Sequence, residues 1–101
     1  MAGLKTETLH GGATLRVHGE IDLASVDTLG EAIGALRSSG SKRLVLDLGE
    51  VTFMDSSGLR FLVNVDAAMR DASTELLLGP ISDAVAKLLD VSGLKSHFRF
   101  A

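Results

Sequence analysis

A change of pattern at residues 53–59 constrains the fold of this chain more than any other stretch. Phe53 and Met54 are followed by an acid, two adjacent serines and a glycine, and apolar residues at helical spacing begin at Leu59. A strand is therefore expected to end here and a helix to begin. In an open α/β sheet such a junction lies at the carboxyl edge, where backbone N–H groups and the helix dipole favour negative charge. A serine at this position can be a helix cap, a nucleophile or a phosphate acceptor.

Residues before this junction predict a hairpin and a helix. Residues 4–9 and 13–17 alternate loosely on either side of a Gly-Gly pair, as expected of a β-hairpin. A helix with Asp22 or Ser25 near its start is predicted next, from four apolar residues at spacings of three and four: Val26, Leu29, Ile33 and Leu36.

The central strand of the sheet is predicted at residues 44–48. This run is almost entirely apolar, which is typical of a strand covered on both faces. Asp47 near its end is expected to be a turn or cap residue. The acidic pair and the lysine that a phospho-accepting receiver domain would need are absent in the expected order. Gly49 and Glu50 are expected to turn the chain.

Beyond the junction, the pattern predicts two more helices and two more strands. A helix is expected over residues 57–72, with Leu59, Leu62, Val65 and Met69 facing the core. A short strand over 74–78 is expected to close at Gly79-Pro80. Ser82 can cap a third helix that ends near Gly93, and residues 97–100 can form a last edge strand.

The predicted order, β-β-α-β-α-β-α-β, indicates an α/β fold with a mixed sheet and helices packed against it. A chain of 101 residues is the size of one domain, so a single domain over 1–101 is expected. A net charge of −3 argues against a nucleic acid partner. The sequence has no cysteine, no signal-peptide pattern and no run near the roughly 18 apolar residues of a membrane span. We therefore expect a cytoplasmic protein without a membrane partner.

Enzymatic and metal-binding readings find no support in the sequence. The junction is not the Gly-x-Ser-x-Gly elbow of serine hydrolases, and no phosphate-binding loop is present. His10, His18 and His97 are scattered over predicted strands, and nothing in the sequence brings any of them to Ser57. No pair of possible ligands has a specific metal-binding spacing. The chain is therefore predicted to be non-enzymatic and to need no cofactor or metal.

The junction carries more polar residues than helix capping requires. Asp55 and Ser56 are both preferred N-cap types, and one of them is expected to satisfy free N–H groups of the helix. Gly58 would cost the helix about 0.5–1 kcal/mol relative to alanine unless something approaches or packs closely there. The glycine therefore indicates a close approach or tight packing at this position.

Four stretches resemble the STAS family, in particular the bacterial anti-sigma factor antagonists. They are residues 19–22 (GEID), 44–48 (LVLDL), 51–59 (VTFMDSSGL) and 88–94 (LLDVSGL). The resemblance covers nearly the whole chain, so it implies a single STAS domain. It also implies a switch that binds an anti-sigma factor, itself a serine kinase of the histidine-kinase-like ATPase fold, and so frees a sigma factor. A PP2C-type phosphatase would reverse the phosphorylation.

The resemblance also implies which residues form the site. Where such proteins carry two adjacent serines the second is the acceptor, which corresponds to Ser57 and leaves Ser56 as the less favoured choice. Asp22 and Asp55 correspond to acidic positions that flank it, and Gly58 is expected to leave room for the kinase to reach the serine. The expected partner-binding residues lie in the loop before the first helix and in the first turns of the second: Asp22, Leu23, Ala24, Ser25, Asp55, Ser56, Ser57, Gly58, Leu59 and Phe61. Phe61 fits a core position better than a contact.

We expect a monomer or weak dimer. Two other interpretations within the family remain open. One is the STAS subunit of a lipid-transport ABC complex, which need not be phosphorylated. The other is a ligand-sensing STAS module, against which the lack of a basic or aromatic cluster near the junction argues.

Overall fold

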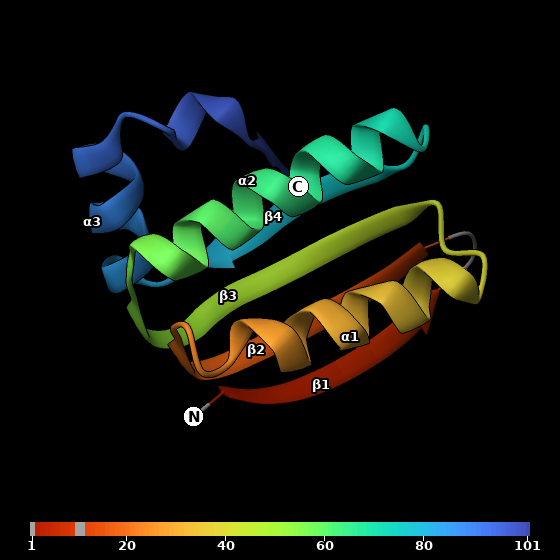
Figure 1. The fold of residues 1–101 in the computed structure, drawn as a ribbon, viewed down its shortest axis with the longest axis horizontal. Coiled ribbons are helices and arrows are strands. Elements are labelled where there is room, and N and C mark those ends of the chain that lie inside the picture. Colours follow the sequence, from red (N-terminus) through yellow and green to blue (C-terminus); the bar gives the residue numbers. More distant parts are fainter. Residues whose placement is uncertain (1, 10–11) are drawn as a thin grey trace.

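The computed structural model describes residues 2–9 and 12–101 (Figure 1). In chain order its elements are β1 (Ala2–Leu9), β2 (Gly12–Ile21), α1 (Val26–Ser38), β3 (Arg43–Met54), α2 (Ser56–Asp71), β4 (Glu75–Ile81), α3 (Asp83–Ser92), a 3-10 turn η1 (Lys95–His97) and β5 (Arg99–Phe100). The α/β class is confirmed. Each helix begins within one residue of its predicted start, because polar N-cap types precede the apolar stripes.

One sheet contains the strands in the order β1-β2-β3-β4-β5. β1 and β2 pair antiparallel, so the predicted hairpin is confirmed, although its turn at residues 10–11 lies outside the described residues. The other neighbouring strands pair in parallel. β3 lies at the centre of the sheet, as predicted.

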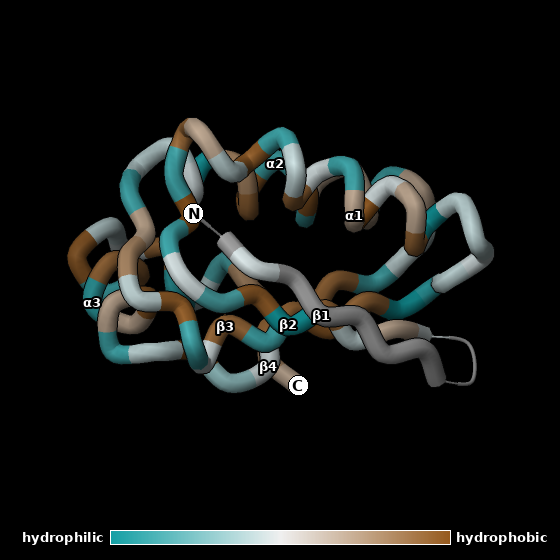
Figure 2. The backbone as a smooth tube through the Cα atoms, turned by 90° about the horizontal axis from the view of Figure 1, so that it is seen from below, coloured by the Kyte–Doolittle hydropathy of each residue, from teal (hydrophilic) through white to brown (hydrophobic). Residues whose placement is uncertain are grey.

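The helices cover one face of the sheet, and the prediction that β3 is covered on both faces is wrong. α1 and α2 lie side by side above the strands (Figure 2). Leu44, Leu46 and Leu48 point to this side and are at most 1% exposed, whereas Val45 and Asp47 point to the other side and are only half-buried. Parallel crossovers are right-handed, and here each new strand is added at the same edge, so successive helices fall on the same face.

β3 does not turn at Gly49 and Glu50 as predicted but continues to Met54. Its pairing with β2 shifts register between Arg16 and His18, so an extra residue of β3 is accommodated as a bulge. The Gly49 N–H donates to Asp47 Oδ1 at 3.0 Å within this bulge. A glycine inside a strand therefore marks a bulge here, where the sequence suggested a turn.

β4 likewise continues through Gly79 and Pro80 to Ile81, although these residues were expected to close it. Leu46 pairs with Leu78, but Leu48 pairs with Ile81, so the proline lies in a bulge of β4, a position at which proline is tolerated. At the carboxyl end, the expected strand over 97–100 is reduced to β5, and His97 belongs to the 3-10 turn.

The core lies between the sheet and the helices. It includes apolar side chains of β2, β3 and β4 and one stripe from each helix; the largest fully buried ones are Leu15, Ile21, Leu29, Leu44, Leu46, Leu48, Leu62, Met69, Leu78 and Leu89. Val65, predicted to face the core, is half-buried at its margin. Among the described residues, no helix is long and apolar enough to span a membrane.

Candidate functional site

Two strand-to-helix junctions meet at the carboxyl edge of the sheet. β2 ends at Ile21 and leads into α1, and β3 ends at Met54 and leads into α2. Ile21 and Met54 are paired in the sheet, and the Asp55 N–H donates to Ile21 O at 3.3 Å. The two parallel strands therefore bring Asp22 and Asp55, the acids predicted to flank the site, to the same edge.

The junction before α1 is closed by its own side chains. Asp22 Oδ1 accepts hydrogen bonds from the N–H groups of Ala24 and Ser25, both at 3.1 Å. Ser25 Oγ accepts from the Asp22 N–H at 2.9 Å and lies 3.0 Å from Glu20 O, to which it can donate. Ser25 is 6% exposed. Its hydroxyl therefore stabilises the loop and is not available to another molecule.

The junction before α2 is capped by Asp55. Its Oδ1 accepts from the Gly58 N–H at 3.1 Å, the N-cap interaction that the sequence predicted for Asp55 or Ser56. With the carboxylate in this role, neither serine is needed as a cap. Within the described part of the chain, the hydroxyls of Ser56 and Ser57 form no hydrogen bond.

Gly58 is required by packing within the molecule. A Cβ atom at this position would lie 2.9 Å from the Ile21 carbonyl oxygen, 2.9 Å from Ile21 Cγ2 and 2.9 Å from Met54 Cγ. The first turn of α2 thus rests directly on the ends of β2 and β3. The expectation that Gly58 leaves room for a kinase is wrong, because the glycine faces the core.

Ser57 lines a shallow hollow of about 240 Å³ between the start of α1 and the first turns of α2. The other lining residues are Leu23, Val26, Arg60, Phe61 and Asn64. Ser57 is half-buried, whereas Ser56 is exposed and does not line this hollow. None of the described lining residues is a histidine or a carboxylate that could accept the proton of the Ser57 hydroxyl.

Apolar side chains surround the hollow. Leu23 is 74% exposed at the tip of the α1 entry loop. Phe61 is half-buried and joins the two helices, since a Cβ at Gly30 of α1 would lie 3.4 Å from Phe61 Cε1. The aromatic ring is therefore partly core, as the sequence favoured, and partly a wall of the hollow.

The structure divides the predicted partner-binding residues into two groups. Exposed or half-buried members are Asp22, Leu23, Ala24, Asp55, Ser56, Ser57 and Phe61, whereas Ser25, Gly58 and Leu59 are buried. The buried three shape the edge from below and do not present a side chain to a partner. Sequence reasoning missed Arg60 and Asn64, although their spacing of three and seven residues from Ser57 places them along one side of a helix.

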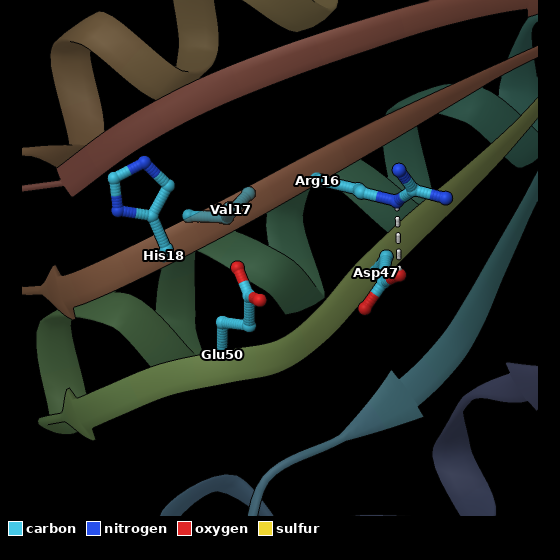
Figure 3. A pocket seen from close by; sticks show the side chains of 5 residues that line it. All are labelled: Arg16, Val17, His18, Asp47 and Glu50. Atoms are coloured by element: carbon cyan, nitrogen blue, oxygen red, sulfur yellow. Dashed lines mark ion pairs between the residues drawn. The ribbon is translucent and has the colours of Figure 1, made fainter.

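A second hollow, of about 340 Å³ and lined mainly by polar side chains, lies on the open face of the sheet (Figure 3). Its lining includes Arg16 and Asp47, whose Nε and Oδ2 atoms are 3.4 Å apart, together with His18 and Glu50. Asp47 lies within β3. The expectation that it is a turn or cap residue is therefore wrong. Both of its carboxylate oxygens already serve the sheet, one in the bulge and one in this ion pair.

A third polar cluster is centred on Asp66, which is 2% exposed on the inner side of α2. Its Oδ2 lies 3.0 Å from Arg70 Nε and 3.4 Å from His97 Nε2. Arg70 Nη2 also donates to His97 O at 3.2 Å. These contacts tie the carboxyl-terminal segment to α2 and have a structural role. No group of possible ligands that could hold a metal ion is found among the described residues.

Comparison with known proteins adds relatives of similar length. Residues 4–101 match the model of the STAS domain. An anti-sigma-B factor antagonist of Staphylococcus aureus (strain NCTC 8325 / PS 47) is 30% identical over 92 residues, which are 91% of this chain and 85% of that protein. One from Staphylococcus epidermidis is 31% identical over 81 residues, 80% of this chain and 75% of that protein.

Solved structures share the fold. An anti-sigma factor antagonist from Mycobacterium paratuberculosis has a TM-score of 0.80 at 28% identity and covers 99% of this chain and 85% of its own. The anti-sigma factor antagonist SpoIIAA in its unphosphorylated form has a TM-score of 0.79 at 22% identity, with 98% of this chain and 88% of that chain covered. At that identity the second likeness concerns the fold alone.

Proposed function

This chain belongs to the STAS domain family, and on that premise we propose that it is an anti-sigma factor antagonist. It binds an anti-sigma factor that is also a serine kinase, and so frees a sigma factor. The observation that carries this proposal is the match to relatives of that name over 91% of this chain and 85% of theirs. The function is regulatory binding and not catalysis.

Phosphorylation of Ser57 switches the protein off in this proposal. Ser57 Oγ forms a bond to the γ-phosphorus of ATP, the bond between that phosphorus and ADP breaks, and the hydroxyl proton passes to a base of the kinase. Three observations support Ser57: its hydroxyl forms no hydrogen bond within the part of the chain that the structure describes, it lines the hollow, and Asp55 caps the helix. Ser56 is the less favoured acceptor, because it lies outside the hollow.

The partner surface surrounds this hollow. We assign to it the accessible members of the predicted set: Asp22, Leu23, Ala24, Asp55, Ser56, Ser57 and Phe61. Leu23 offers the largest exposed apolar side chain there. Ser25, Gly58 and Leu59 act indirectly, by fixing the positions of the loop and the first helical turn.

Phosphorylation is expected to block binding without refolding the chain. It adds about −1.5 to −2 charges at the start of α2, which the helix dipole tolerates with a gain of about 0.3–1 kcal/mol. A partner pressed against the hollow must desolvate that phosphate, and a like charge at about 4 Å adds up to roughly 4 kcal/mol at an effective dielectric of 20. A loss of about 3 kcal/mol already weakens affinity more than a hundredfold.

The test combines labelling with binding. The chain is incubated with ATP and candidate anti-sigma kinases from the same genome, and intact mass is measured. One added phosphoryl group is expected, abolished by Ser57→Ala and retained by Ser56→Ala. In calorimetry, Ser57→Asp is expected to lose at least about a hundredfold in affinity while its circular dichroism stays unchanged. Ser38→Asp is the control, because it adds the same charge at an exposed serine at the carboxyl end of α1, outside the assigned surface.

Other results would overturn parts of the proposal. Labelling abolished only by Ser56→Ala would move the acceptor to Ser56. No labelling and no kinase binding, with copurification of an ATPase and a permease, would point to the transport subunit instead. Binding of a small molecule in place of a kinase would point to the ligand-sensing module.

The remaining features of the proposal follow from the same family reading. The chain acts as a single STAS domain over residues 1–101, in the cytoplasm, as a monomer or weak dimer. A PP2C-type phosphatase removes the phosphate and restores binding. Neither nucleic acid nor a membrane is a partner, and neither a cofactor nor a metal is needed.

A further inference from the structure

Two arginines of α2 have opposite surroundings. Arg70 has an acid four residues before it, and its Nε lies 3.0 Å from Asp66 Oδ2. Arg60 has no acid at the neighbouring helical positions, which are Ser56, Ser57, Val63 and Asn64. It forms no ion pair within the described part of the chain. Arg70 is used by the fold, and Arg60 is an exposed guanidinium that the fold does not use.

Arg60 also has the right position to reach Ser57. Both residues line the same hollow, three positions apart on one side of α2. Helical side chains lean toward the amino-terminal end, so the stem of Arg60 is directed over the turn that carries Ser57. The remaining lining residues are neutral, and the nearest acid on this helix, Asp55, already accepts from the Gly58 N–H.

We propose that Arg60 binds the phosphate of phosphorylated Ser57 within the same molecule. This inference rests on the proposed phosphorylation of Ser57. A guanidinium presents paired N–H donors that match phosphate oxygens, and such charge-assisted bonds are about twice as strong as neutral ones. Arg60 thereby holds the phosphate in the hollow between Leu23 and Phe61, over the surface assigned to the partner. The phosphate then blocks the partner both by its charge and by the position in which Arg60 holds it.

The experiment measures the phosphate itself in the full chain. Phosphoserine is incorporated at position 57 during translation, and its second ionisation is followed by ³¹P NMR in the original chain, in Arg60→Gln and in Arg60→Lys. Lys87→Gln serves as the control, because it removes an exposed cation from α3, on another element. Circular dichroism checks that each variant is folded.

The expected result is a lower phosphate pKa in the original chain and in Lys87→Gln than in Arg60→Gln, because the Arg60 guanidinium favours the dianionic phosphate. Arg60→Lys should lie between them, because an ammonium supplies charge without the paired donors. Equal pKa values in the original chain and in Arg60→Gln would overturn the proposal.

This measurement needs neither kinase nor anti-sigma factor, so its outcome is separate from the test of the proposed function. A pKa that depends on Arg60 in a chain that binds no anti-sigma factor would keep the phosphate site and reject the function. Loss of kinase binding on phosphorylation without any dependence on Arg60 would do the reverse.

Discussion

The starts of α1 and α2 are built from the same residue types and yet differ in what they leave free. Each follows a parallel strand, and each has an aspartate that accepts backbone N–H bonds: Asp22 before α1 and Asp55 before α2. At α1 the following serine, Ser25, turns inward and its hydroxyl is occupied. At α2 the hydroxyl of Ser57 forms no hydrogen bond within residues 2–9 and 12–101, and Ser57 lines a hollow.

This difference shows how a common helix start becomes a site. Polar side chains that form their hydrogen bonds with nearby backbone groups stabilise the fold and are not available to a partner. A polar side chain becomes available for chemistry when a neighbouring residue forms the structural hydrogen bond in its place. Asp55 caps the helix, and Gly58 lets the helix pack closely against the sheet. The side chain of Ser57 is therefore needed for neither interaction.

The largest effect is expected for Gly58→Ala. The added Cβ would meet Ile21 and Met54 at 2.9 Å, one contact being a backbone carbonyl, and such overpacking costs about 1–3 kcal/mol. Urea unfolding measures the loss. Gly34→Ala is the matched control in α1, where nothing lies within 4 Å, and should gain about 0.5–1 kcal/mol. Equal effects at the two glycines would remove the packing argument.

Ser25→Ala should come next, with a loss of about 1–2 kcal/mol in the free energy of unfolding. The Asp22 N–H and Glu20 carbonyl lose their hydroxyl partner at a site that is 6% exposed. Thermal or urea unfolding checks this. Ser25→Thr keeps the hydroxyl and serves as the control. A Ser25→Ala chain as stable as the original would mean that the two serines do not differ as described.

Asp55→Ala should cost about 1 kcal/mol, since it removes the N-cap of α2. Asp55→Asn retains an acceptor oxygen and should lose only about a few tenths of 1 kcal/mol in the free energy of unfolding. The comparison uses the same unfolding assay. If Asp55→Ala were neutral, a serine would have to be able to replace the cap, and Ser57 would not be free of a structural role.

The smallest effect is expected for Ser57→Ala, within about 0.5 kcal/mol of the original stability. Its hydroxyl supports nothing in the described part of the chain, so its loss should affect labelling and not folding. Differential scanning calorimetry is sensitive enough to check this. A destabilisation as large as that of Ser25→Ala would contradict the contrast between the two junctions.

The sequence predicted the helices well, because each apolar stripe is preceded by a residue type that is favoured at N-caps: Ser25, Asp55 and Ser82 stand at the N-cap positions, and the side chains of Asp55 and Ser82 accept a cap hydrogen bond. The predicted turns were wrong where glycine and proline mark bulges. Gly49 and Gly79 interrupt the pattern locally, but the strand continues because its neighbours keep pairing on either side. Only a partner strand distinguishes a bulge from a turn.

The site could be predicted only in part, for a related reason. Asp55 and Ser57 are adjacent in sequence to a recognisable junction, and the structure brings both to the predicted edge. The burial of Ser25 and the exposure of Arg60 depend on how α1 and α2 sit against each other, which helical spacing alone does not determine. Asp66 is the clearest case, since an acid within the helix is paired there with His97 from the far end of the chain.

The sheet order, identical to the chain order, bears on how the molecule is assembled. Each strand pairs with the strand that precedes it in the chain, so each loop that must close is short. The entropy lost on closing a loop grows with its length, although only slowly. The sheet can therefore grow from a nascent hairpin by one strand and one helix at a time. The edge of β4 is covered last, when the few residues of β5 and the His97 contact to Asp66 arrive.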